Sequence, residues 1–205
     1  MSTITIVGAG NMAAAIGGRA AAAGHAVELM SRDAARAQAL AKRLGHGTTV
    51  GTFGERPAGD VVVLAVLHAA AVDAVTRFGD ALSGKVVVDI TNPFNADGSG
   101  LVTGPGDSVA YRVAAVLPDD AHVVKAFNTI YGGAISGGAP IDAFVAGDDA
   151  GAKARVTELV ETLGMRPLDA GALEMAHALE WAGLLLVGVS RNGAGFDIAL
   201  GIQAL

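Results

Sequence analysis

Apolar residues occur along the chain in short continuous runs and in longer stretches with helical spacing. The continuous runs, rich in valine and isoleucine, predict strands at residues 3–8, 26–30, 60–66, 85–90, 121–127 and 141–147. Such near-continuous apolar character is typical of strands buried on both faces of a parallel sheet. Helices are predicted between them at residues 11–23, 33–44, 69–82, 107–116 and 150–163. This alternation predicts an α/β fold with a doubly wound parallel sheet.

Two segments depart from this alternation. Residues 91–108 form a long stretch rich in glycine, proline and asparagine, and a loop of that length inside a compact domain is usually functional. The chain after Leu173 predicts a helix whose second half, WAGLLLVGV at 181–189, is apolar on every side. Because such a helix must be covered all round, we expect a subunit interface there, in a homodimer.

Composition narrows the class of protein. The chain has 205 residues, 52% of them hydrophobic, with 29 glycines and a net charge of −6, so a nucleic-acid partner is not expected. It has no cysteine, which excludes disulfides and thiolate metal sites, and no other residues have the spacing of a metal site. No targeting segment is visible and the longest apolar stretch is too short to span a bilayer, so we expect a cytoplasmic protein without a membrane partner.

A glycine-rich motif follows the first predicted strand. GAGNMA, residues 8–13, fits the pattern G-x-G-x-x-A between a strand and a helix. Gly8 permits the tight turn, Gly10 lets the backbone approach a pyrophosphate, and Ala13 allows close packing of helix and strand. The phosphates would lie on the N–H groups of Gly10, Asn11 and Met12, at the positive end of the helix dipole. The motif predicts a Rossmann-like dinucleotide site.

The segment after the second predicted strand selects the dinucleotide. Ser31, Arg32 and Arg36 stand where a carboxylate usually binds the adenosine ribose. A hydroxyl and two guanidiniums suit the 2′-phosphate of NADP(H), which a carboxylate would repel. Two alternatives remain: Ser31 caps the helix while both arginines are solvated, or Asp33 binds the 2′-hydroxyl of NADH. We expect NADP(H).

These residues lead to a family resemblance. GAGNMAAAIGGRAAAAGHAVELMSRD resembles the opening of the deazaflavin-dependent NADP oxidoreductases, which use coenzyme F420, and is also similar to that of pyrroline-5-carboxylate reductase. VVKAFNTI (123–130) and RPLDAG (166–171) resemble the deazaflavin family and the related cytoplasmic domains of membrane metalloreductases. The resemblance covers nearly the whole chain, whereas a pyrroline-carboxylate reductase would need a longer helical dimerisation domain.

The resemblance implies roles for further residues. Ala9 to Met12 would contact the pyrophosphate, and Gly132 would lie close to NADP. The nicotinamide would lie at the strand end formed by Ala65, Val66, Leu67 and His68. Asn92 and Pro93, after the next strand, would also border the cofactor cleft. Asn128, Thr129 and Ile130 would face a second redox cofactor. The resemblance also implies an NADP-binding Rossmann-like domain at 1–170, a small helical C-terminal part at 171–205 that closes the second site, and a dimer.

The predicted function is hydride transfer between NADP(H) and a flavin-like partner, with coenzyme F420 as the leading co-substrate. Such transfer requires alignment of two rings, so no catalytic side chain is assigned. One alternative is an NADPH-dependent reductase of a small carbonyl, imine or quinone, with His68 or Tyr131 as proton donor. Another is a non-catalytic module that senses NADP(H). Lys125 is expected to pair with a buried carboxylate such as Asp89.

Overall fold

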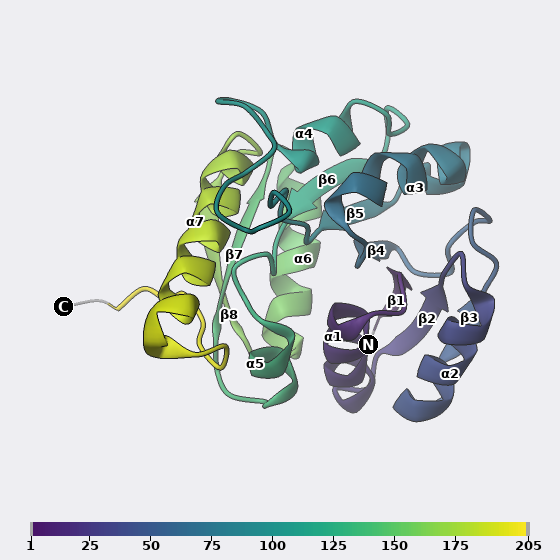
Figure 1. The fold of residues 1–205 in the computed structure, drawn as a ribbon. Coiled ribbons are helices and arrows are strands. Elements are labelled where there is room, and N and C mark those ends of the chain that lie inside the picture. Colours follow the sequence, from purple (N-terminus) through teal and green to yellow (C-terminus); the bar gives the residue numbers. More distant parts are fainter. Residues whose placement is uncertain (1, 204–205) are drawn as a thin grey trace.

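An eight-stranded sheet runs through the molecule in the order β3-β2-β1-β4-β5-β6-β7-β8 (Figure 1). The computed structural model describes residues 2–203. Its strands are β1 (Thr3–Val7), β2 (Ala26–Met30), β3 (Thr49–Gly51), β4 (Val61–Leu64), β5 (Val86–Asp89), β6 (His122–Lys125), β7 (Asp142–Gly147) and β8 (Arg166–Gly171). Its helices are α1 (Asn11–Ala22), α2 (Ala34–Leu44), α3 (Ala71–Phe78), α4 (Val109–Ala114), α5 (Gly132–Ser136), α6 (Ala150–Thr162) and α7 (Met175–Val189).

Strand pairing confirms the predicted α/β, doubly wound class. Strands β1 to β6 are parallel, and β1 lies between β2 and β4, where the strand order reverses. Ligands of open α/β sheets bind at the carboxyl ends of strands at such a switch point. One pair differs from the expectation of a fully parallel sheet, since β7 is antiparallel to β6. The short α5 between them does not form a crossover, so the chain returns in the opposite direction.

Most predicted helices are confirmed, and their ends follow from capping. Asp33, Ser108 and Asp149 accept hydrogen bonds from backbone N–H groups in the first turns of α2, α4 and α6. The predicted helix 69–82 is divided into the 3₁₀ turn His68–Ala70, α3 and a second 3₁₀ turn at Gly79–Leu82. Within residues 2–203, no helix has the length and apolar character needed to cross a membrane.

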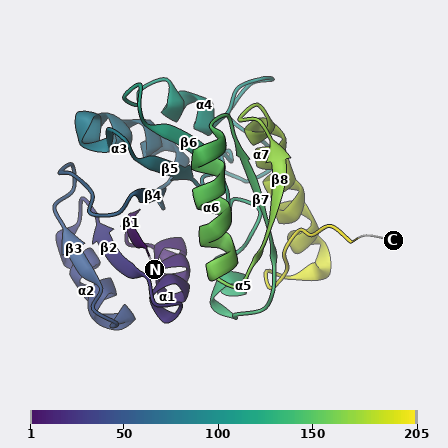
Figure 2. The same cartoon turned by 180° about the vertical axis from the view of Figure 1, so that it is seen from behind.

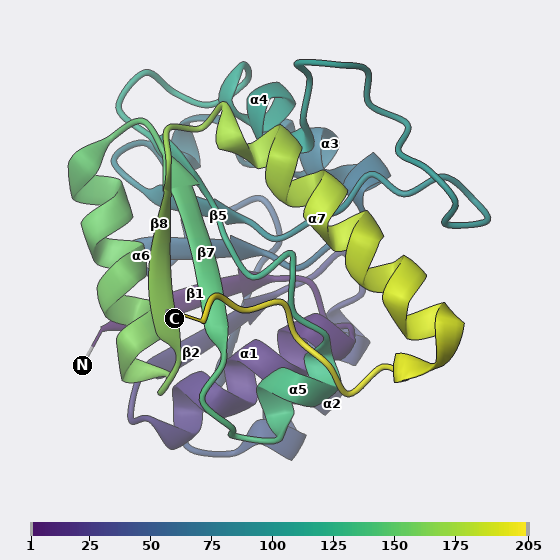
Figure 3. The ribbon, with the colours of Figure 1, turned by 90° about the vertical axis from the view of Figure 1, so that its left-hand side faces the viewer.

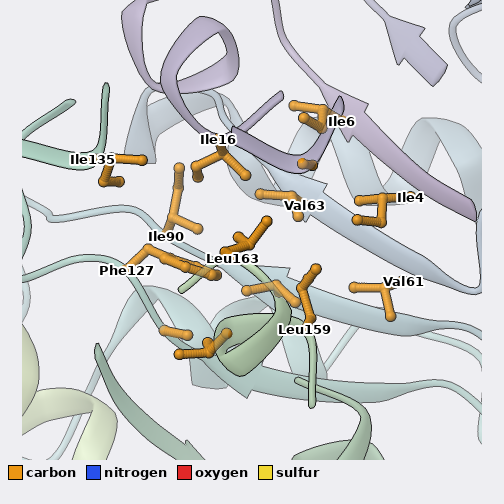
Figure 4. Packing of buried hydrophobic residues seen from close by; sticks show 14 of the residues in the cluster. Ile4, Ile6, Ile16, Val61, Val63, Ile90, Phe127, Ile135, Leu159 and Leu163 are labelled. Atoms are coloured by element: carbon orange, nitrogen blue, oxygen red, sulfur yellow. The ribbon is translucent and has the colours of Figure 1, made fainter. Parts of the chain in front are cut away.

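The core lies in two layers, one on each face of the sheet. Helices α1, α2, α5 and α6 cover one face (Figure 2), where side chains such as Ile4, Ile16 and Phe127 pack together (Figure 4). Helices α3, α4 and the start of α7 cover the other face over Val62, Leu64 and neighbouring residues. Figure 3 shows α7 crossing beside β7, with the final segment of the chain returning below it.

Candidate dinucleotide and redox site

The turn from β1 to α1 is possible only because residue 8 is glycine. Gly8 has φ +130°, and a Cβ built on it would lie 2.1 Å from the carbonyl oxygen of Ala65. The backbone of this turn is therefore in direct contact with the end of β4. This contact sets the glycine turn beside the carboxyl end of the neighbouring central strand.

The start of α1 is open to a ligand. Gly10 is its N-cap and provides no side-chain hydrogen bond, so the N–H groups of the first turn lack an intrahelical partner. A Cβ placed on Gly10 would have no atom within 4 Å, so the space in front of this helix end is free. An unblocked helix N-terminus of this kind is suited to a pyrophosphate, because its N–H groups and dipole both favour negative charge.

Two connected hollows extend from this turn. The larger is a cavity of about 910 Å³, lined by the ends of β1 and β4, by α2, by the chain after β3 and by α3. The smaller is an open hollow whose lining residues are Ala9, Gly10, Ser31, Arg32, Asp33 and Arg36. Ala9, Ser31 and Arg32 belong to both. A dinucleotide can therefore place its adenosine in the cavity and a ribose phosphate in the hollow.

The structure separates the roles of the polar residues after β2. Asp33, not Ser31, caps α2: its carboxylate accepts from the backbone N–H of Arg36 at 3.0 Å. Ser31 instead accepts from the N–H of Asp33 at 3.2 Å and keeps its hydroxyl proton for another partner. Arg32 and Arg36 are exposed and take part in none of the ion pairs formed within the described chain. These free guanidiniums fit the 2′-phosphate of NADP(H).

A second, narrower pocket of about 180 Å³ lies at the ends of β5 and β6, against α7. Its lining is apolar and aromatic apart from two amides and one phenol, and contains no carboxylate, lysine, arginine or histidine. The lining residues are Met12, Ile90, Asn92, Phe94, Phe127, Asn128, Ile130, Tyr131, Gly132, Gly183, Leu186 and Val187. Met12 connects this pocket to the glycine turn, so a dinucleotide that passes α1 can extend into it.

Two asparagines hold the pocket wall against α7. Asn92 donates to the carbonyl of Asn128 at 2.7 Å, and Asn128 donates back to the side-chain oxygen of Asn92 at 2.9 Å. Asn128 also donates to the carbonyl of Leu179 at 2.7 Å. A Cβ on Gly183 would lie 2.7 Å from Asn92, so only glycine lets α7 approach this closely. The side-chain oxygen of Asn128 is buried and has no partner within residues 2–203.

A fully buried ionic cluster lies beneath this wall. The Lys125 ammonium contacts Asp89 at 2.8 Å, Glu180 at 3.0 Å and the carbonyl of Thr91 at 2.6 Å. The expected pairing of Lys125 with Asp89 is therefore confirmed, and Glu180 is a third member. Burial raises the pKa of the Glu180 carboxyl above its ordinary value, although the Lys125 charge opposes this. The cluster joins β5, β6 and α7, and so fixes the elements that form the pocket.

The two side chains considered as proton donors are both constrained. Tyr131 lies 3.0 Å from the hydroxyl of Ser190, which itself donates to the carbonyl of Leu186 at 2.8 Å. The Tyr131 proton is therefore directed to Ser190 and not to the pocket. His68 begins the 3₁₀ turn after β4 and lines neither the pocket nor the two hollows.

The predicted site residues divide among these spaces. Ala65, Val66 and Leu67 line the large cavity together with Gly8 and Ala9. Asn92, Asn128, Ile130 and Gly132 line the narrow pocket, whereas Pro93 and Thr129 are buried and line neither space. Asn11 is exposed in the first turn of α1.

Sequence reasoning missed several lining residues. On the large cavity these include Gln38, Phe53, Asp73 and Arg77, and on the narrow pocket they include Phe94, Phe127 and Gly183. Phe127 has φ +60°, a left-handed conformation that is rare for a bulky residue and typical of functional sites. No sequence signal marks this strain, because it arises from the packing of the chain after β6.

Comparison with known proteins finds relatives along most of the chain. The family model described as NADP oxidoreductase coenzyme F420-dependent matches residues 3–93, which include the glycine turn and the Ser31–Arg36 segment. The chain is 29% identical to the F420-dependent NADP reductase of Methanothermobacter marburgensis, over 93% of this chain and 92% of that protein.

Two further relatives extend the comparison. The chain is 30% identical to Metalloreductase STEAP3 of Rattus norvegicus over 86% of its own length, but it spans only 35% of the rat protein. A crystal structure of a candidate F420-dependent NADP reductase from Arthrobacter sp. FB24 matches 100% of both chains with a TM-score of 0.89 at 24% identity, which shows a shared fold. The resemblance and the enzyme class expected from the sequence are thus confirmed: the chain is similar to NADP-dependent oxidoreductases, among them reductases named as F420-dependent.

Proposed function

We propose that the protein transfers hydride between NADP(H) and the ring of a deazaflavin, coenzyme F420. The observation that carries this proposal is the lining of the narrow pocket, which is apolar and aromatic and has no acid or base in it. Flat aromatic ring systems suit such walls, and two ring cofactors need alignment more than proton transfer from the protein.

The bound cofactors supply the hydride chemistry, since the dihydronicotinamide donates and the deazaflavin accepts. The protein's part is binding and orientation. The α1 N-terminus and Gly10 would hold the pyrophosphate, and Ser31, Arg32 and Arg36 the 2′-phosphate. The paired amides of Asn92 and Asn128 would fix the wall against which the rings align. We further propose that the C-terminal part, residues 171–203 of the described chain, closes this pocket over the end of the dinucleotide domain, since α7 contributes Gly183, Leu186 and Val187 to it.

The alternative of a small carbonyl or imine reductase has less support. Such a reaction needs a proton donor beside the nicotinamide. The Tyr131 hydroxyl proton is engaged by Ser190, and His68 is outside the pocket.

The test is a spectrophotometric assay of the purified protein with NADPH and oxidised F420, with NADH in place of NADPH as the control. The expected result is bleaching of the deazaflavin absorbance with NADPH and much slower bleaching with NADH. A small-substrate reductase is indicated instead if NADPH is oxidised by carbonyls or imines but not by F420, with loss of rate in Tyr131→Phe. A protein that binds NADPH without oxidising it in the presence of any acceptor would be a sensor.

A further inference from the structure

The large cavity is lined by two charged side chains that are not among the residues assigned to the phosphates. Asp73 and Arg77 lie one turn apart on α3, and both line the cavity and are exposed. Residues at this spacing commonly form an ion pair on a helix surface. Here neither belongs to any ion pair formed between residues 2 and 203. Both charges therefore face the cavity without a protein partner in it.

The position of Arg77 is held by the turn after β3. A Cβ built on Gly54 would lie 3.1 Å from Nε and 3.2 Å from Cγ of Arg77, so the side chain rests directly on this turn. Gly54 has φ +93°, a conformation that favours glycine. The turn thus supports the Arg77 stem and leaves its guanidinium at the cavity wall.

We call the part of the cavity beside this pair the slot. Ala70 and Ala74 provide a wall of small side chains on the α3 side, one turn apart. Arg32, at the end of β2, lines the same cavity next to the hollow assigned to the 2′-phosphate. The ring attached to the phosphorylated ribose must therefore enter this slot, and in NADP(H) that ring is adenine.

Adenine presents an amino donor at C6 next to a ring-nitrogen acceptor, a pattern that one acceptor and one donor can read together. We propose that Asp73 and Arg77 read this edge: the Asp73 carboxylate accepts from the 6-amino group, and the Arg77 guanidinium donates to the neighbouring ring nitrogen. The pair makes the site specific for adenine. This inference rests on NADP(H) binding and is independent of the identity of the hydride acceptor.

The test compares NADPH with its deaminated analogue, reduced nicotinamide hypoxanthine dinucleotide phosphate, in which a carbonyl replaces the 6-amino group. Dissociation constants are measured by titrating the fluorescence of the dihydronicotinamide. The analogue brings its carbonyl oxygen against the Asp73 carboxylate, so the wild-type protein is expected to bind it roughly tenfold more weakly, or worse. Asp73→Ala is expected to remove most of this preference, mainly by weakening NADPH.

Two variants complete the design. Asp73→Asn retains an acceptor and adds a donor for the carbonyl, so it is expected to bind the analogue more tightly than the wild-type protein does. Asp80→Ala removes an exposed carboxylate that does not line the cavity and is expected to leave both constants unchanged. Equal binding of both nucleotides by the wild-type protein would overturn the proposal, as would a preference that survives in Asp73→Ala. Either result leaves the NADP(H) site and the proposed hydride transfer standing.

Discussion

Gly8 and Gly10 stand two residues apart in the turn after β1, and an added methyl group meets different surroundings at each. At Gly8 it would overlap the carbonyl of Ala65, at 2.1 Å, in a backbone with φ +130°. Gly8→Ala should therefore lower the free energy of unfolding by about 1–3 kcal/mol or more. At Gly10 it would meet no protein atom within 4 Å but would occupy the approach of the pyrophosphate. Gly10→Ala should keep the wild-type Tm and lose NADPH affinity, which thermal unfolding and nucleotide titration check together.

The residues after β2 set the choice between NADPH and NADH. Combined Ser31→Ala and Arg32→Ala substitutions should weaken NADPH binding by roughly ten- to a hundredfold, because a charge-assisted contact contributes about 1.5–3 kcal/mol. NADH binding should hardly change, since Asp33 remains engaged as the cap of α2. Titration of the double variant with both nucleotides measures this, and an equal loss for both would contradict the 2′-phosphate assignment.

At the residue scale, the sequence predicts what a local motif determines. The glycine turn and the arginines after β2 are predictable because their spacing from a strand end places them. Asp73 and Arg77 were missed because helical spacing does not show which side of α3 meets a cavity. Glu180 was missed because its role depends on Lys125, a residue distant in the chain.

At the scale of elements, buried strands and amphipathic helices could be predicted because the spacing of their apolar residues reflects which side chains are buried. The exceptions have physical reasons. Strand β3 is only three residues long, and β8 is a half-exposed edge strand that contains Arg166, Pro167 and Asp169, so neither has an apolar run. Strand β7 is antiparallel because the connection through α5 is short. The apolar residues of β7 have the same spacing in either direction, so they do not predict it.

The ionic cluster that joins β5, β6 and α7 predicts a stability that depends on pH. Folding raises the pKa of the Glu180 carboxyl above its ordinary value of 4.5. The group therefore stabilises the folded state at pH values below 4.5, and this stabilisation is lost as the pH rises through the folded-state pKa. Glu180→Gln keeps an oxygen for Lys125 and the N–H of Val109, and does not ionise. Its stability relative to the wild-type protein should therefore increase as pH rises above 4.5.

Removing the positive member of the same cluster should be far more harmful. Lys125→Met leaves two carboxylates buried together, and breaking a buried pair in this way costs about 3–5 kcal/mol. Denaturant titrations of both variants across a range of pH measure the difference. A Lys125→Met protein as stable as Glu180→Gln at neutral pH would show that the cluster does not hold α7 to the sheet.

At the scale of the whole molecule, α7 lies at the surface (Figure 3), and its outer side has an apolar stripe that no other part of residues 2–203 covers. Trp181, Leu185 and Val189 recur every four residues and are 49%, 60% and 46% exposed. The indole N–H already donates to His177 at 3.1 Å, so Trp181 can bury its ring without losing a hydrogen bond. Aromatic and aliphatic side chains grouped in this way are typical of subunit interfaces.

We expect this stripe to form a homodimer, with α7 of one chain against α7 of the other. Sedimentation of the wild-type protein should then give twice the chain mass of 20.3 kDa, and Leu185→Glu should give the monomer, because a two-fold interface places the two new charges close together. Val116→Glu, at an exposed apolar residue outside α7, is the matched control and should remain dimeric. A wild-type protein that sediments as a monomer at micromolar concentration would rule the dimer out. Since the other side of α7 lines the narrow pocket, a monomeric Leu185→Glu protein should also lose hydride transfer while it still binds NADPH.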